Sequence, residues 1–125
     1  QPFVTAALAQ NEKLSIIMDL TKEWDNVQGE GSGSRLVTGV TIVNNDFLKE
    51  HEDLVDTFLQ EHEASIAFTA EDPDAAAELI AKAEIVAKAP IAKKALPYCN
   101  ITFISGDEMK TALSASHGIS LTLAS

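Results

Sequence analysis

Short runs of apolar residues recur along the chain, and three of them have the composition of β-strands. Residues 14–20 (LSIIMDL), 35–43 (RLVTGVTIV) and 100–105 (NITFIS) are rich in aliphatic and β-branched side chains. The run 35–43 carries aliphatic side chains on both faces of the expected strand: Leu36, Val40 and Ile42 on one, Val37 and Val43 on the other. Such a pattern is typical of a strand buried inside an α/β sheet, and Gly39 predicts a bend or a close backbone approach at its middle.

A helical spacing of apolar residues predicts helices elsewhere, most densely in the second half of the chain. Residues 44–46 are predicted as a turn and helix cap, and Thr21 as the cap of a short helical turn. Pro73 and Pro90 fit the first turns of two further helices, the second of which should stop before Pro97. The predicted helical stretches are 2–11, 21–27, 54–66, 71–85, 89–96 and 106–116.

The composition excludes several classes of partner. The 125 residues are 46% hydrophobic, and nine basic residues face nineteen acidic ones, for a net charge of -10. A surface this acidic repels nucleic acid and anionic membrane, so we expect neither as a partner. The single cysteine allows no internal disulfide. The chain has no 18-residue apolar run and no charged-then-apolar leader, so we expect no membrane span and no signal peptide within it.

A search for catalytic or metal-binding motifs finds none. The stretch GEGSGS lacks the lysine and the following helix of a phosphate-binding loop. The three histidines, His51, His62 and His117, lack metal-ligand spacing, and Val55 stands where a zinc-protease helix would carry its second histidine. We therefore predict no catalytic residue, no metal and no cofactor. His62 is interpreted as a partly buried helix residue and Cys99 as a small core residue, with a reactive thiol as the alternative for Cys99.

Three features are candidates for ligand binding. Arg35, the only arginine, stands where the Gly/Ser-rich loop meets the expected strand, and its planar guanidinium suits carboxylate, sulfonate or phosphate. A surface ion pair is the alternative. Trp24, the only tryptophan, could stack on a ligand or pack in the core. The corner formed by Gln1, Pro2 and Phe3 could line a cleft.

Several segments together resemble one protein family. QPFVTAALAQNEKLSIIMDLTKEW is similar to the EPFVTAAL…DLTEEW stretch of substrate-binding proteins of bacterial ABC importers, of the nitrate/sulfonate/taurine type related to the thiamine-pyrimidine-precursor family. GVTIVNNDFLKEHEDLVDTFLQEHEASIAF resembles its GVLVVRKDFLEEHPEAVEAFLKEYEASI segment. The later helices share its P-x-C-N-I corner and G-x-E-M turn. The resemblance covers residues 1 to about 113.

The resemblance implies an α/β, two-lobed, periplasmic-binding-protein-like fold with a ligand cleft between the lobes. Residues 1–34 would end the second lobe, with the Gly/Ser loop 28–34 as the hinge. Residues 35–116 would supply the crossover strand and the C-terminal helices of the first lobe. Residues 117–125 form an atypical tail, expected to fray or to pair as an edge strand. The chain would then be the C-terminal portion of a longer protein.

Ligands of two-lobed proteins lie beside the crossover strands, and this position selects the candidate ligand-binding residues Gln1, Phe3, Ser32, Ser34, Arg35 and Thr38. Two departures from the family pattern affect this set. Gln1 stands where the family has a carboxylate, and SASHGISLTLAS replaces its usual Gly/Pro/Asp-rich tail.

The resemblance therefore predicts the solute-binding component of an ABC importer, which delivers a small polar or anionic organic molecule to a permease outside the cytoplasm. One alternative is an enzyme of the same fold, from pyrimidine or menaquinone synthesis. Another is a fragment that self-associates without binding a ligand. Apolar surfaces left uncovered by a missing lobe predict a homo-oligomer, with segments exchanged at the 28–34 loop.

Overall fold

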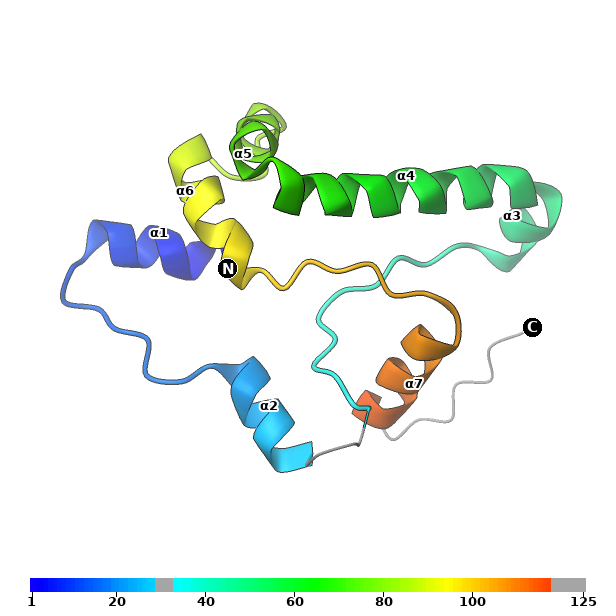
Figure 1. Ribbon diagram of the computed structural model, residues 1–125, viewed down its shortest axis with the longest axis horizontal. Helices are drawn as coiled ribbons and strands as arrows, with labels where there is room; N and C mark the ends of the chain where they lie inside the picture. Colours follow the sequence, from blue (N-terminus) through cyan, green and yellow to red (C-terminus); the bar gives the residue numbers. More distant parts are fainter. Residues whose placement is uncertain (29–32, 118–125) are drawn as a thin grey trace. The chain divides into compact units, whose positions relative to one another are not determined.

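The computed structural model describes residues 1–28 and 33–117, with side chains as far as residue 114. These residues form seven α-helices and one 3-10 helix, and they contain no β-strand (Figure 1). The helices are α1 (Phe3–Gln10), α2 (Leu20–Gln28), α3 (Asn45–Glu50), α4 (Glu52–Glu71), α5 (Pro73–Lys82), α6 (Ala89–Ala95), η1 (Leu96–Tyr98) and α7 (Gly106–His117).

The predicted helix-rich second half is confirmed, and local signals explain where its helices begin. The Asn44 side chain accepts hydrogen bonds from the backbone N–H groups of Asp46 and Phe47, as the predicted cap requires. The Asp72 carboxylate accepts one from Ala75 N at 3.0 Å, and Pro73 follows it in the first turn of α5. Each of these helices therefore starts at a residue whose side chain satisfies free backbone donors.

The predicted cap of α2 was wrong by two residues. Thr21 lies inside the helix, and its backbone N–H donates to a carboxylate oxygen of Asp19 at 3.0 Å. Asp19 also offers its carbonyl oxygen to Glu23 N at 3.0 Å. An aspartate two residues before the first free donor caps as well as a threonine does, and here the aspartate precedes the threonine in the chain.

The three predicted strands are wrong for the described residues, because residues 14–19, 35–43 and 100–105 pair with no neighbouring backbone as a strand must. A strand exists only through hydrogen bonds to a second strand, so an apolar run alone cannot form one. The burial expected on both faces of 35–43 is absent too, since Val40 and Ile42 are 55% and 87% exposed. The α/β sheet that these runs predicted is therefore not seen.

The chain forms two compact units. Unit 1 comprises Gln1–Ser15 and Asn44–Phe103, and unit 2 comprises Ile16–Val43 and Ile104–Ser125. Within unit 1, α5 packs on both α4 and α6, and α1 packs on α6. An ion pair between Lys93 of α6 and Asp74 of α5 adds a link at the surface.

The buried core is built from small side chains. The buried apolar residues of the described chain are all alanines: Ala76, Ala77, Ala92, Ala95 and Ala112. The first four lie on α5 and α6, where small side chains let two helix backbones approach closely. Many larger apolar side chains stay exposed, including Leu54 and Phe58 on α4.

Candidate functional site

The candidate ligand-binding residues are divided between the two units. Gln1 and Phe3 belong to unit 1, whereas Ser34, Arg35 and Thr38 belong to unit 2. Ser32, and with it most of the predicted hinge loop, lies outside the described residues. Each unit is therefore considered by itself.

In unit 1, Gln1 has a local structural role. Its side-chain oxygen Oε1 accepts hydrogen bonds from Thr5 N at 3.2 Å and from Thr5 Oγ1 at 2.7 Å. These bonds satisfy a free donor in the first turn of α1, so the amide acts as a cap. The i, i+4 spacing of Gln1 and Thr5 is the signal for this contact in the sequence. Phe3 is 84% exposed and offers its ring to solvent.

In unit 2, a hydrogen bond between Trp24 and Ser34 links α2 to the segment after the Gly/Ser loop. The indole Nε1 of Trp24 donates to Ser34 Oγ at 3.1 Å. Ser34 is buried and Trp24 half-buried. This contact favours the packing interpretation of Trp24 over ligand stacking, because an indole N–H removed from water needs an acceptor. It also turns the Ser34 hydroxyl toward the protein.

Gly33 explains how the chain reaches this contact. Its φ of +68° is a left-handed conformation that glycine adopts without strain. A Cβ at Gly33 would lie 3.2 Å from the Thr111 side chain of α7, which is tight for a side-chain contact. Glycine therefore serves both the turn and the close approach of α7 to the backbone before Ser34.

Arg35 and Thr38 follow directly and are both exposed. The backbone N–H of Val37 donates to the Arg35 carbonyl at 3.0 Å, which bends the chain between them. Among the described residues, no carboxylate forms an ion pair with Arg35. The surface ion pair considered for Arg35 is therefore not seen in the described chain, and its guanidinium keeps five donors for an external anion.

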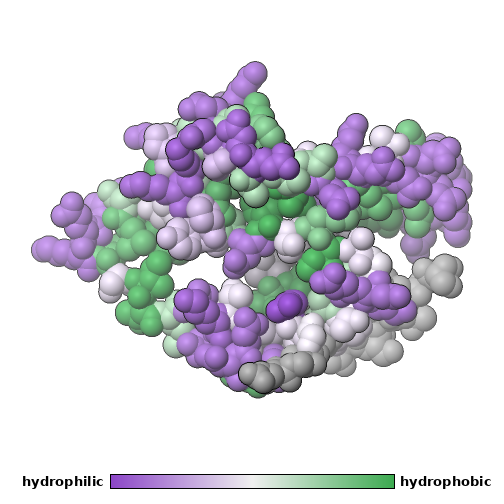
Figure 2. All heavy atoms as spheres, in the orientation of Figure 1, coloured by the Kyte–Doolittle hydropathy of each residue, from purple (hydrophilic) through white to green (hydrophobic). Residues whose placement is uncertain are grey.

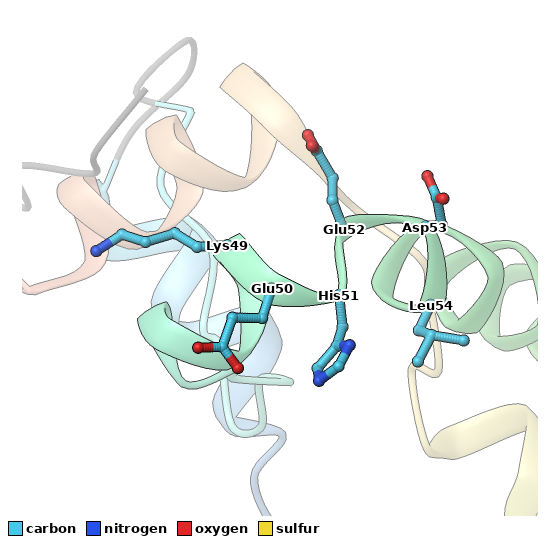
Figure 3. A pocket seen from close by; sticks show the side chains of 6 residues that line it. All are labelled: Lys49, Glu50, His51, Glu52, Asp53 and Leu54. Carbon is cyan, nitrogen blue, oxygen red and sulfur yellow. The ribbon is translucent and has the colours of Figure 1, made fainter.

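A shallow hollow of about 420 Å³ lies where α3 meets α4, lined by Lys49, Glu50, His51, Glu52, Asp53 and Leu54. Figure 3 shows that these side chains diverge, with Glu52 and Asp53 on one side and Glu50, His51 and Leu54 on the other. The His51 ring packs against Phe47, with ring centroids 4.7 Å apart. Ligand sites need polar groups that converge, so this hollow has the character of a solvated helix junction.

His62 and Cys99 have structural environments. His62 is half-buried on α4, as predicted, and its ring stacks on Phe58 at 5.6 Å between centroids. Its other neighbour is Phe103, edge-on at 6.0 Å. Cys99 is half-buried, with Sγ 3.3 Å from the Ala95 carbonyl oxygen. Over the part of the chain that the structure describes, no group of three or more His, Cys, Asp or Glu side chains is placed to hold a metal ion.

Comparisons with known proteins identify no relative. No family model matches the chain, no curated protein matches it, and no solved structure matches it. In the described residues, none of the helices combines the length and the apolar character needed to cross a membrane.

Proposed function

We propose that this chain is the C-terminal portion of a solute-binding protein of a bacterial ABC importer of the nitrate/sulfonate/taurine type. The observation that carries the proposal is the order and spacing of several family-like segments over residues 1 to about 113. The ligand would be a small organic molecule with an anionic group, such as taurine or another alkyl sulfonate. The parent protein would work outside the cytoplasm and deliver its solute to a permease.

The apolar runs that remain unpaired support the proposal. Residues 14–20, 35–43 and 100–105 have the composition of sheet strands, yet the described residues offer them no strand partner. Ile17 and Ile42 are 94% and 87% exposed. Side chains of this kind stay in water at a cost of about 25 cal/mol per Å² of apolar surface. A two-lobed α/β fold would bury such runs in its two sheets. The absence of those sheets would explain why these apolar side chains are exposed.

Arg35 supplies the chemistry for an anionic ligand. Its fork of N–H donors matches two oxygens of a sulfonate or carboxylate, and it stands two residues after Gly33. The acidic chain would repel an anion elsewhere, since the net charge is -10. An exposed arginine with no described ion-pair partner is therefore the position at which an anion is best held.

Replacing Arg35 tests this role. We expect Arg35→Ala to weaken taurine binding by about ten- to a hundredfold, because a hydrogen bond to a charged group contributes about 1.5–3 kcal/mol. Arg35→Lys should lose less, since it keeps the charge and loses only the planar fork. Calorimetric titration with taurine and with a neutral pyrimidine measures both effects.

Lys22→Ala is the matched control. Lys22 is an exposed cation of α2 in the same unit, so its removal changes the net charge by the same amount. Binding that is lost equally in Lys22→Ala and Arg35→Ala reflects overall charge alone. Binding that survives Arg35→Ala unchanged shows that Arg35 does not hold the ligand.

A further inference from the structure

Residues 36–43 are an apolar segment whose backbone lacks hydrogen-bond partners from Thr38 onward. From Thr38 to Val43, no backbone group forms a hydrogen bond with another described residue. Val40 and Ile42 are 55% and 87% exposed. Figure 2 shows hydrophobic residues at the surface among hydrophilic ones on the face it presents. Unpaired backbone groups together with exposed β-branched side chains are the conditions under which a segment adds to another strand.

The sequence of this segment is nearly self-complementary. In a symmetric antiparallel pair, a two-fold axis passes midway between the two copies of one central residue. A residue a given number of positions before the centre in one copy then faces the residue the same number of positions after the centre in the other copy. With the axis at Gly39, the two copies of Gly39 face each other, and the pairs on either side are aliphatic or β-branched: Leu36 with Ile42, Val37 with Thr41, and Thr38 with Val40, each occurring twice. Val43 then faces Arg35. Such cross-strand pairs stabilise a ladder.

Electrostatics also favours this segment as the point of contact between two copies. Each copy has a net charge of -10, so most approaches bring acids together. None of the nineteen acidic residues lies between positions 31 and 45, and Arg35 is the only charge there. A ladder over 36–43 therefore places no carboxylate opposite another within the pair.

We infer that residues 36–43 form an interaction surface for a second copy of this chain, as an antiparallel ladder centred on Gly39. An added Cβ at Gly39 would meet no atom within 4 Å, so the space around the centre of the segment is open to a second copy. The contact is isologous, so it closes as a dimer and does not propagate into a fibre. It depends on no ligand, and it overlaps the proposed solute site at Thr38.

A two-stranded ladder alone is marginally stable in water, whereas three or more strands with an apolar face can be stable. Each copy holds a second apolar run in the same unit, residues 16–18 before the cap of α2, in which Ile17 is 94% exposed. Two copies can therefore contribute four strands, with the 36–43 pair at the centre. The short 16–18 runs would occupy the edges and pair with part of its free backbone.

Sedimentation over a range from micromolar to millimolar protein tests the dimer. We expect a monomer–dimer equilibrium whose dissociation constant rises about tenfold or more in Val40→Glu, because two like charges then face each other diagonally across the ladder. Leu79→Glu is the control: Leu79 is also 55% exposed, but it lies on α5 in unit 1. The Leu79→Glu variant should dimerise like the unmodified chain, and circular dichroism should show unchanged helix content in both variants.

A monomer at every concentration overturns the inference. Equal weakening by Val40→Glu and Leu79→Glu also overturns it, because overall charge would then govern the association. Unchanged dimerisation in Val40→Glu would place the contact elsewhere in the chain and would also overturn the inference.

Cysteine cross-linking tests the register. In a Cys99→Ser background, Gly39→Cys should form an intermolecular disulfide under mild oxidation, because facing residues of a ladder lie about 4.5–5.5 Å apart at Cα. Leu36→Cys should not, because two copies of that residue lie about 20 Å apart in this register. Efficient cross-linking of Leu36→Cys with none at Gly39→Cys contradicts the pairing.

Discussion

Replacing Ala95 by aspartate is expected to unfold the helical packing of unit 1. Ala95 is 1% exposed on α6, where this helix packs against α5 and α1. An aspartate there loses its water without gaining a partner, at a cost of about 3 kcal/mol or more. Small domains have total stabilities of about 5–15 kcal/mol, and a core built only of alanines belongs at the low end. Urea unfolding followed by circular dichroism measures the change.

Ala64→Asp is the control for helix propensity. Ala64 is exposed on α4, so the substitution costs about 0.7 kcal/mol at most through the lower helix propensity of aspartate. The difference between the two variants isolates the burial of the carboxylate. If both unfold at the same urea concentration, the packing of α5 on α6 does not stabilise the unit.

Replacing Phe103 by alanine is expected to release the last segment of unit 1 from α4. Phe103 contacts the His62 ring edge-on, and His62 in turn stacks on Phe58. Loss of a half-buried phenylalanine with one aromatic contact should lower the free energy of unfolding by about 2 kcal/mol. Amide hydrogen exchange in residues 99–103 and along α4 should accelerate.

The matched aromatic control is Tyr98→Ala, since Tyr98 is 67% exposed and lies five residues earlier. Its loss should change stability by about 0.5 kcal/mol or less. A double-mutant cycle with His62→Ala should return a coupling of about 0.5–1.5 kcal/mol to Phe103. Zero coupling would show that the two rings do not pack in solution.

The helices could be predicted because their signals are local. Asn44, Asp72 and Pro73 act within one turn of their own positions, so the residue types alone indicate where α3 and α5 begin. Thr21 shows the limit of such reasoning, because Asp19, two residues earlier, caps the helix instead by accepting from the Thr21 backbone N–H. Two capping residues so close in the chain cannot be ranked from their types.

Whether the apolar runs form strands could not be predicted, because a strand depends on a partner strand elsewhere in the chain. The pattern of residues 35–43 indicates which side chains the segment can bury. It does not indicate whether a neighbouring strand is present to pair with the segment. The same reason applies to the site. Arg35 was identified by its rarity and its place beside the loop, whereas the bond between Trp24 and Ser34 spans ten residues and arises only when the chain folds back.

Amide-resolved NMR titration of the isotope-labelled chain with taurine tests the proposed solute site most directly. Shifts are expected to cluster along residues 33–38, with the Arg35 side chain responding most strongly, and a neutral pyrimidine should produce smaller ones. Affinity should be weak, because a single portion of a cleft cannot exclude water from the ligand. Shifts confined to the helices of residues 73–113, or none at millimolar taurine, would contradict the assignment of this chain as a solute-binding module.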